Sequence, residues 1–502
     1  MLNKILIITL TIFSTNCFSQ DSLEVITADS LGFYTSSTLP EFWEQMDDIF
    51  NDPTFNNAHW GVVIQSLETG EYFYKRNEDK FFVPASNMKL FTTSAALLLL
   101  GEDFKYTTNI FTDGRIDGSV IEGNLIVQGS GDPTVSGRFY GDNVYAVYSK
   151  WADSLIVMGI DEIRGNIIGD DNSFDDLGLG KGWSWDYESN WFAAQSSAIS
   201  LNDNCVDVIL KYDRPGDKLN LHVYPNTDYV VINNQLRLVS EDSLTDVNAH
   251  RERGSNVITL YGTFSRKIDS LKTYVTVNNP TQFSMVVLHK VLTQKGITVS
   301  GYPIDIDEYR DELDYNNLHF LFNHYSPDLK EIVKVVNKGS HNFYAEQLLK
   351  TIGLVIEGFG SVENGVEASR EIFKEIGLNP ENIVQVDGSG LSHQNMTTPR
   401  QITTLLKFLY GSKYFASFYN SLPISGVDGT LGTRMKNTRA QNMVRAKTGY
   451  IRSARSLSGY TKTGDNEPIV FSMICNNFNV PVKLAENIQD LVCLRLINFK
   501  RK

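Results

Sequence analysis

The chain has 502 residues, with 45 Lys and Arg against 59 Asp and Glu, and a formal net charge of −14 at pH 7. This acidic balance argues against a nucleic-acid-binding protein, which needs a basic surface. Hydrophobic residues make up 42% of the chain, which is enough for ordinary globular cores, and a chain of this length usually folds into about two to four domains.

Residues 1–20 have the pattern of a secretory signal. Lys4 gives the positive start, Ile5–Phe13 form the apolar segment, and small or polar residues follow. This segment is too short to span a bilayer as a permanent helix. Cys17 offers the alternative of a lipoprotein, but Ser14–Asn16 before it lack the usual leucine and small residue. No later segment is long and apolar enough to span, so we expect a periplasmic protein without a membrane span.

The first predicted strands follow a polar stretch near residue 55. Trp60–Ser66 and Glu71–Lys75 alternate in polarity around the turn at 67–70, which predicts a β-hairpin. An apolar run then extends from Leu90 to Leu100, between Pro84 and Gly101. A proline before such a run and a glycine after it predict a helix.

Ser86 and Lys89 lie at the start of that helix. Residues three apart share a helical face, so both side chains point the same way. A serine needs a neighbouring base to attack a carbonyl, and a lysine can be that base only if its pKa falls well below about 10.4. Alone the Ser-x-x-Lys pattern is weak, because a capping serine and an exposed lysine would give the same spacing.

The next part of the chain, residues 106–278, is rich in strand-like segments and turns. A helix is predicted from Pro280 to Gly296. Ser340-His341-Asn342 then precedes an amphipathic helical stretch, and Lys447-Thr448-Gly449 lies in the strand-like segment 444–451. We interpret His341 as structural, because adjacent residues on a helix do not face each other.

Further strands are predicted at 456–462 and 468–475, and a last helix at 482–496. Two strands at one end of the chain and three at the other each make a poor sheet alone. Together they predict one five-stranded antiparallel sheet closed by the two ends of the chain.

Ser-x-x-Lys, Ser-x-Asn and Lys-Thr-Gly in this order are the signature set of penicillin-binding proteins and serine β-lactamases. The chain resembles, more closely, the class C low-molecular-mass penicillin-binding proteins (the penicillin-binding protein 4 type), which are D-alanyl-D-alanine carboxypeptidases and endopeptidases. The further matching segments are Gly129–Thr134, Gly182–Trp185, Leu201–Asp207, Ala345–Leu349, Asp387–Ser392 and Val427–Leu431.

The resemblance implies an α+β fold. A β-lactamase/transpeptidase-like domain, with a five-stranded antiparallel sheet and helices on both faces, would carry a large β-rich insertion. We therefore expect a signal peptide at 1–20 and a penicillin-binding domain at 21–105 and 279–502. The insertion would occupy 106–278 as two nested small domains.

The resemblance also implies roles for the motif residues. Ser86 would attack the carbonyl of a penultimate D-alanine, and Lys89 would be its base. Lys447 would be a second cation that helps to keep Lys89 neutral and, with Thr448, attracts the substrate carboxylate. Ser340 would relay a proton to the leaving amine. Asn342 would hold Lys89 and the substrate amide.

The oxyanion hole would use the backbone N–H groups of Ser86 and of Tyr450, which follows Gly449 of the substrate-binding Lys-Thr-Gly motif. Relatives usually carry Ser or Thr at the position of Tyr450. His393 replaces an arginine found in many relatives, and Arg452 stands where a relative can have glutamine.

Arginine is the better bidentate partner for a carboxylate, so Arg452 would recognise an acidic, diaminopimelate-type stem peptide. The alternative, which fits the sequence equally well, is that Arg452 is a solvated surface residue. The segment that contains Asp170 and Asp171 resembles a stretch of the family's insertion that can contact the free amine of the substrate. The two aspartates also fit a simple turn.

These patterns predict a periplasmic serine-type D-alanyl-D-alanine carboxypeptidase, with endopeptidase activity as an extension. Its partners would be peptidoglycan stem peptides and β-lactams, and penicillins would acylate it. The alternatives are a β-lactamase or esterase on the same scaffold, or a non-catalytic cell-wall binding protein. The sequence indicates no cofactor and no metal site, and it leaves the oligomeric state open. Cys205, Cys475 and Cys493 are an odd number of cysteines and cannot all pair within one chain. Cys475 and Cys493 are predicted to be buried thiols.

Overall fold

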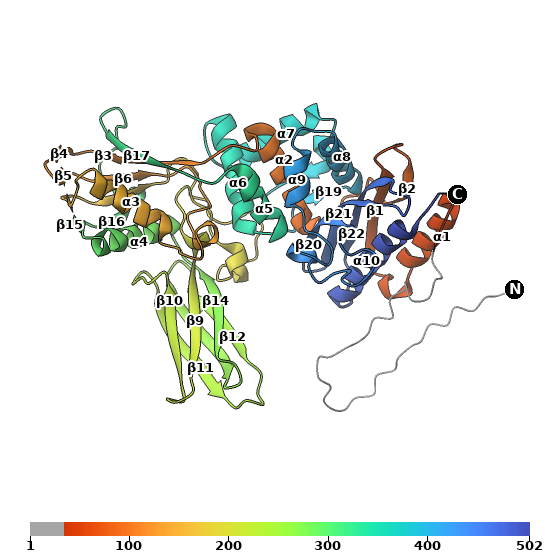
Figure 1. Cartoon of the computed structure of the whole chain (residues 1–502), viewed down its shortest axis with the longest axis horizontal. Coiled ribbons are helices and arrows are strands. Elements are labelled where there is room, and N and C mark those ends of the chain that lie inside the picture. Colours follow the sequence, from red (N-terminus) through yellow and green to blue (C-terminus); the bar gives the residue numbers. More distant parts are fainter. Residues whose placement is uncertain (1–34, 502) are drawn as a thin grey trace.

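The computed structural model describes residues 35–501. The predicted signal peptide and Cys17 lie outside the described residues. The described part is elongated: a sheet-and-helix domain lies at one end, a smaller mixed unit at the other, and a blade of long strands projects from between them (Figure 1). No helix within residues 35–501 is long and apolar enough to cross a membrane.

The main domain contains the predicted five-stranded antiparallel sheet, which confirms the fold class. Its strands come from the two ends of the chain, with the last three strands completing the hairpin of the first two. In spatial order they are β2 (Tyr72–Arg76), β1 (His59–Ser66), β22 (Pro468–Asn476), β21 (Ala454–Lys462) and β20 (Arg445–Ile451).

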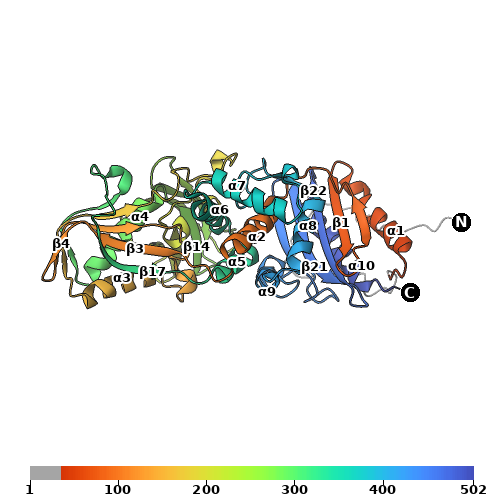
Figure 2. The ribbon, with the colours of Figure 1, turned by 90° about the horizontal axis from the view of Figure 1, so that it is seen from above.

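Helices cover both faces of this sheet (Figure 2). Along β22 the side chains alternate: Phe471 and Met473 pack into one core, whereas Val470 and Ile474 pack into another. This period of two is the ordinary geometry of a strand buried on both faces. The first core is covered by α1 (Leu39–Phe50) and α10 (Val482–Asn498).

The second core carries the helices that position the candidate site. These helices are α2 (Met88–Leu100), α5 (Leu329–Lys338), α6 (Asn342–Glu357), α7 (Val362–Glu375), α8 (Pro399–Tyr410) and α9 (Phe415–Ser421). A short ladder of β18 (Ile383–Val384) and β19 (Met396–Thr397) lies between α7 and α8.

The mixed unit at the far end consists of two sheets and two helices. Its larger sheet contains β16 (Pro303–Asp305), β8 (Ile167–Asp170), β6 (Leu125–Gln128), β3 (Thr107–Thr112) and β17 (His319–Tyr325). Its smaller sheet contains β15 (Thr298–Val299), β7 (Glu162–Ile163), β5 (Val120–Glu122) and β4 (Arg115–Asp117). The helices are α3 (Ala146–Val157) and α4 (Pro280–Gln294).

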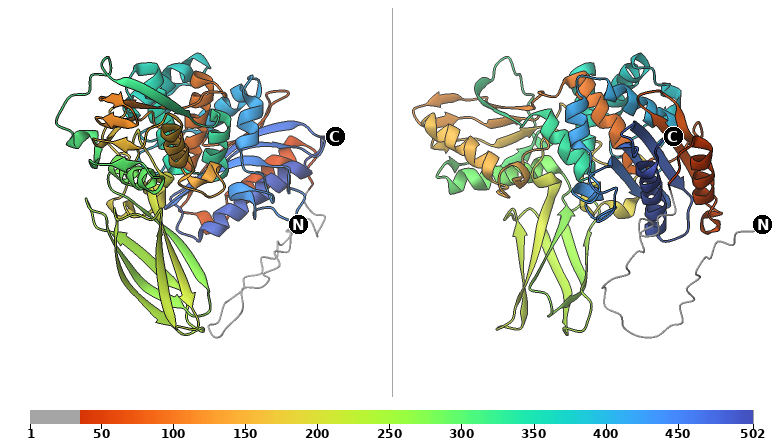
Figure 3. Two further views of the ribbon diagram at one scale, coloured as in Figure 1. Left: turned by 60° about the vertical axis from the view of Figure 1, so that its left-hand side comes forward. Right: turned by 45° about the vertical axis from the view of Figure 1, so that its right-hand side comes forward.

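The blade is formed by two three-stranded sheets that pack face to face (Figure 3). One sheet contains β10 (Lys218–Tyr224), β9 (Cys205–Asp213) and β14 (Ser270–Thr276). The other contains β11 (Val231–Val239), β13 (Val257–Ser265) and β12 (Asp246–Arg251). In chain order the blade lies between β8 and α4 of the mixed unit.

The predicted return to the main domain at residue 279 was wrong. α4 buries Val287 and Leu288 in the core of the insertion, β16 pairs with β8, and β17 pairs with β3. The insertion therefore extends to Tyr325. Strands of two to seven residues with mostly accessible side chains carry too little polarity pattern to be recognised from sequence.

Candidate active site

Ser86 lies in a tight turn between the sheet and a buried helix. The predicted helix begins as a single 3-10 turn, Ala85–Asn87, and continues as α2 until Gly101. Ala85 has a φ of +49°, a left-handed conformation that is costly for a residue with a Cβ. The turn thus holds strained backbone immediately before the serine.

Three hydrogen bonds fix this turn against the sheet. Asn87 Nδ2 donates to the Lys447 carbonyl at 2.8 Å, and Ser458 Oγ donates to Asn87 Oδ1 at 2.6 Å. Ser456 Oγ donates to the Pro84 carbonyl at 2.6 Å. Asn87 was not predicted from the sequence to have a role, although its amide joins the Ser86–Lys89 motif to the Lys447–Gly449 motif.

Lys89 is fully buried, and its ammonium nitrogen contacts three other parts of the site. Nζ lies 3.0 Å from Ser86 Oγ and donates to Asn342 Oδ1 at 2.6 Å. It also donates to the Ser389 carbonyl at 2.7 Å. Ser86, Lys89 and Asn342 therefore lie close together in the structure, as the motifs predict.

Burial lowers the pKa of Lys89 to about 7, against the opposing influence of the Glu346 and Asp387 carboxylates. At this pKa a large fraction of the lysine is neutral near pH 7, as a general base requires. Desolvation is therefore the largest cause of the lowered pKa of Lys89.

Hydrogen bonds join Lys89 to Ser86 and Asn342, and Lys447 to Ser340, and these five residues are called the cluster below. Lys447 and Ser340 form the side of the cluster opposite Lys89. Lys447 Nζ donates to Ser340 Oγ at 2.8 Å and to the Thr448 carbonyl at 2.8 Å. Burial, followed by the charges of Lys89 and Arg455, lowers the pKa of Lys447 well below its usual value. Ser340 has a φ of +55°, so a second motif serine also sits on strained backbone.

The strand β20 passes unusually close to the turn that carries Ser86. A Cβ on Gly449 would lie 2.7 Å from the Pro84 carbonyl oxygen and 3.0 Å from the Ser86 nitrogen, so a larger residue would push the strand away. Thr448 Oγ1 donates to Thr430 Oγ1 at 2.7 Å. The Tyr450 side chain is 53% exposed.

The sequence analysis gave no role to two buried carboxylates behind Lys89. Glu346 accepts hydrogen bonds from the backbone N–H groups of Gly388 and Ser389, each at 2.8 Å. Asp387 accepts from the N–H groups of Gly390 and Ser392, each at 2.7 Å. Together they shape the loop whose Ser389 carbonyl contacts Lys89. The motifs Ala345–Leu349 and Asp387–Ser392 were the available signal.

The insertion reaches the same cluster. Asn342 Nδ2 donates to the Phe192 carbonyl at 2.7 Å, and Trp183 Nε1 donates to Asp387 Oδ2 at 3.0 Å. Phe192 and Trp183 also pack around Ala85 and Ile451 in a small hydrophobic cluster. The segment 183–192 is therefore a wall of the candidate site.

Comparison with known proteins agrees with this geometry. The model of the D-Ala-D-Ala carboxypeptidase 3 (S13) family matches residues 42–495. The chain belongs to the S13 family. It is thus a serine-type hydrolase of the D-alanyl-D-alanine carboxypeptidase type, of the class C penicillin-binding protein 4 kind.

Individual relatives match over most of their length. A D-alanyl-D-alanine carboxypeptidase of Actinomadura sp. (strain R39) is 29% identical over 476 residues, covering 93% of this chain and 86% of the relative. Penicillin binding protein 4 (dacB) from Haemophilus influenzae has a similar fold, with a TM-score of 0.77 at 23% identity over 90% of this chain and 98% of that one. The same protein complexed with a β-lactam gives a TM-score of 0.73 at 22% identity, with the same coverage.

In this S13-family chain, three of the predicted substrate-binding residues lie outside the hydrogen-bonded cluster. Arg452 and His393 are exposed, and neither forms an ion pair within residues 35–501. Asp170 is buried in β8 of the insertion, where it accepts hydrogen bonds from the Tyr315 hydroxyl and from the Asn172 N–H. This bonding fits the turn interpretation of Asp170.

The remaining interpretations from sequence concern His341 and the cysteines. His341 Nε2 lies 3.1 Å from Asp203 Oδ2 and 3.2 Å from Arg138 Nη2, and no hydrogen bond among the described residues joins it to Ser86 or Ser340. Cys205, Cys475 and Cys493 are free and buried, which agrees with the prediction for Cys475 and Cys493. Among residues 35–501, no group of three or more His, Cys, Asp or Glu is arranged to hold a metal ion.

Proposed function

We propose that this S13-family chain hydrolyses the D-Ala-D-Ala end of peptidoglycan stem peptides through an acyl-enzyme on Ser86. The observation that carries the proposal is the 3.0 Å separation of Ser86 Oγ from the buried Lys89 Nζ. A serine nucleophile needs such a base. The pKa of about 7 makes Lys89 suitable at neutral pH.

In the acylation step, Ser86 Oγ bonds to the carbonyl carbon of the penultimate D-alanine while its proton passes to Lys89. Negative charge then develops on the carbonyl oxygen. The backbone N–H groups of Ser86 and Tyr450 would donate hydrogen bonds to it, because preorganised donors stabilise this charge most effectively. The close packing of Gly449 against the Ser86 nitrogen supports this pairing.

The C–N bond of the substrate then breaks, and the leaving amine takes a proton through the Ser340 hydroxyl. Lys89 has taken one proton from Ser86 and the leaving amine receives one proton, so the numbers of protons removed and delivered are equal. Water afterwards attacks the ester carbonyl, which frees Ser86 and releases the shortened peptide as a carboxylic acid. Asn342 keeps Lys89 in place throughout by its 2.6 Å bond.

The terminal carboxylate of the substrate would lie beside Lys447 and the Thr448 hydroxyl. Lys447 is buried without a carboxylate partner in the cluster, and burial lowers its pKa. An arriving carboxylate would favour its protonated form, so substrate binding and charging of Lys447 would occur together. This coupling favours substrates that end in a free carboxylate.

Four finer assignments belong to the same proposal. The protein would act in the periplasm, where its substrate lies, and β-lactams would acylate Ser86, as the Haemophilus relative solved with a β-lactam suggests. Arg452 would pair with an acidic group of the stem peptide at the site entrance. Cleavage of D-alanyl cross-links would use the same steps with a larger leaving group.

A labelled penicillin and a D-Ala-D-Ala peptide test the proposal together. We expect a stable adduct at Ser86, identified by peptide mass spectrometry, and release of free D-alanine. Rapid turnover of the penicillin without D-alanine release would indicate the alternative β-lactamase or esterase. Absence of both labelling and release would indicate a non-catalytic cell-wall binding protein.

A further inference from the structure

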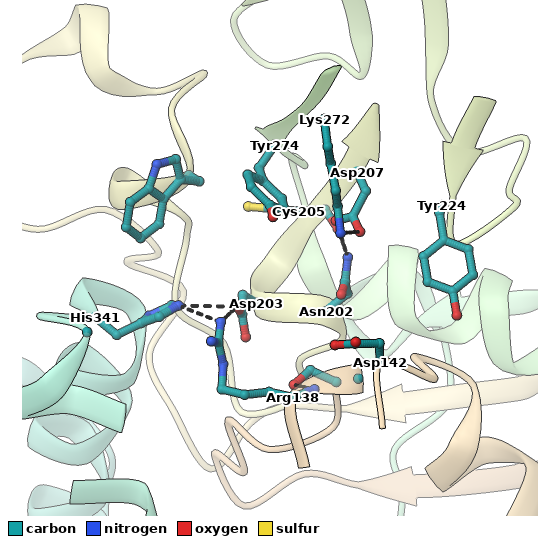
Figure 4. Close-up of a pocket in the computed structure, with 14 residues that line it drawn as sticks. Arg138, Asp142, Asn202, Asp203, Cys205, Asp207, Tyr224, Lys272, Tyr274 and His341 are labelled. Atoms are coloured by element: carbon teal, nitrogen blue, oxygen red, sulfur yellow. Dashed lines mark hydrogen bonds and ion pairs between the residues drawn. The ribbon is translucent and has the colours of Figure 1, made fainter. Parts of the chain in front are cut away.

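A cavity of about 440 Å³ lies between the start of α6 and the insertion. Residues from the mixed unit, from the blade and from the main domain line it (Figure 4). Ser86 and Lys89 are not among its lining residues, so the cavity is separate from the cluster described above.

Two segments of the chain nevertheless form a wall that the cavity shares with the Ser86 cluster. Gly339 and His341 line the cavity, and Ser340 between them accepts the hydrogen bond from Lys447. Trp191 also lines it, and the next residue, Phe192, accepts the hydrogen bond from Asn342. A molecule in the cavity would therefore lie against the backbone that positions Ser340 and Asn342.

The floor of the cavity carries buried polar atoms that lack partners. Asp203 Oδ2 lies 2.6 Å from Arg138 Nη2 and 3.1 Å from His341 Nε2. Asp203 Oδ1 and His341 Nδ1 are buried without a hydrogen-bond partner among the described residues, and His341 is 6% exposed. Native proteins rarely leave such atoms unpaired, but both atoms are almost completely covered. A ligand would instead meet the accessible parts of Arg138 and Asp203, whose side chains are 41% and 20% exposed.

The walls combine charge with aromatic surface. Lys272 Nζ pairs with Asp207 Oδ2 at 2.6 Å, while Trp191 and Tyr274 are 42% and 45% exposed. Charges of both signs with aromatic faces suit a peptide that carries carboxylate, amine and aliphatic groups. An apolar small molecule would desolvate these ion pairs without offering them a hydrogen bond in return.

We propose that this cavity binds the second stem peptide of a cross-linked substrate, the one that departs with the leaving amine. The inference rests on the proposed function, in which Ser340 supplies the proton to that amine. The leaving peptide must therefore lie on the Ser340 side of the cluster, where the cavity is. Free D-alanine ends at its carboxylate beside Lys447, whereas a second stem continues beyond it and carries the groups that the cavity matches.

The test compares two substrates: a cross-linked muropeptide dimer and an uncross-linked pentapeptide. The variant Lys272→Gln/Tyr274→Ala removes one cation and one ring from the cavity wall on β14. Both side chains are about half exposed, and neither contacts the Ser86 cluster. Lys218→Gln, an exposed charge on the same sheet outside the cavity, is the matched control.

We expect the double variant to lose at least about tenfold in kcat/KM for the dimer, mostly through KM. D-alanine release from the pentapeptide and penicillin acylation should stay within about twofold of wild type. The control should match wild type with both substrates. In a Ser86→Ala background, calorimetry should show the same weakening of dimer binding without turnover.

Equal loss with both substrates, or unchanged dimer cleavage, would overturn the proposal. So would a wild-type enzyme that releases D-alanine but never cleaves the dimer, and this result would leave the proposed carboxypeptidase function intact. Failure of the proposed function itself would be recognised differently, by the absence of D-alanine release and of penicillin labelling in the wild type.

Discussion

The Nζ atom of Lys89 donates a 2.6 Å hydrogen bond to Oδ1 of Asn342, although 253 residues separate the two in the chain. This contact joins the first motif to the second, and the Lys447–Ser340 contact joins the second to the third. The whole insertion lies between the residues that meet here. The site is consequently assembled from distant segments around one buried lysine.

The first prediction concerns the nucleophile. Ser86→Ala should abolish penicillin labelling and D-alanine release, because loss of a serine nucleophile costs roughly 10⁶ in rate in a well-characterised hydrolase. Thermal unfolding should be unchanged, because the substitution removes only a hydroxyl. Undiminished labelling of the variant would show that another residue is acylated.

The second prediction separates the two lysines. Lys89→Arg keeps a charge but cannot accept a proton near neutral pH, because arginine remains protonated. Its acylation rate in stopped-flow measurements with a chromogenic cephalosporin should collapse. Lys447→Arg should retain partial activity, since that position supplies charge. Equal tolerance of arginine at both positions would contradict these roles.

The third prediction is a pH dependence. Lys89 acts as a base only when neutral, so the acylation rate should rise with pH around its pKa of about 7 and then level off. The Glu346 carboxylate raises the pKa of Lys89, and Glu346→Gln should therefore move the midpoint to lower pH.

Glu357→Gln, at the exposed end of the same helix, is the control for the pH measurement and should keep the wild-type midpoint. The pH–rate profile of each variant should be measured together with its unfolding temperature. A Glu346→Gln midpoint at or above the wild-type value would show that Glu346 does not set the proton affinity of Lys89.

The fourth prediction concerns the stem peptide. Arg452→Gln should lower kcat/KM for peptides with an acidic side group by roughly tenfold, the effect of one charge-assisted pair. Because Arg452 is exposed, the lower end of the range for such pairs applies. Acylation by a simple penicillin should hardly change. Parallel loss with both ligands would make Arg452 structural and direct attention to His393.

The fifth prediction tests the clamp on the Ser86 turn. Asn87→Ala would leave the Lys447 carbonyl and the Ser458 hydroxyl with one partner fewer in a buried place. Such a loss costs about 1–3 kcal/mol per group, so the free energy of unfolding in urea should fall by a few kcal/mol. Acylation should also slow. Unchanged stability would mean that the turn is held mainly by Ser456.

The central sheet and the three motifs could be predicted because their signals are local. Strands such as Pro468–Asn476 show strong apolar patterns, and Ser86 and Lys89 are fixed by helical spacing. The helix α1 carried a signal that the sequence analysis did not use: Thr38 and Glu41 form a capping box at its start.

The cause of the lowered pKa of Lys89 could not be predicted in the same way. It is the complete burial of Lys89, which outweighs the opposing effect of the Glu346 and Asp387 carboxylates, and both the burial and the approach of these carboxylates require the fold. Asp170 illustrates another limit: its sequence context fitted both a substrate contact and a turn, and its bond from Tyr315, far along the chain, could not be predicted from that context.

The order of strands in the five-stranded sheet has a consequence for biosynthesis. β1 and β2 emerge early, but β22, which pairs with β1, is the last strand of the described residues, and such long-range pairing is slow to form. The clamp on Asn87 likewise needs β20 and β21. A nascent chain therefore has an unformed catalytic turn until almost its whole length has been made, and a chain truncated before residue 445 would have no active serine.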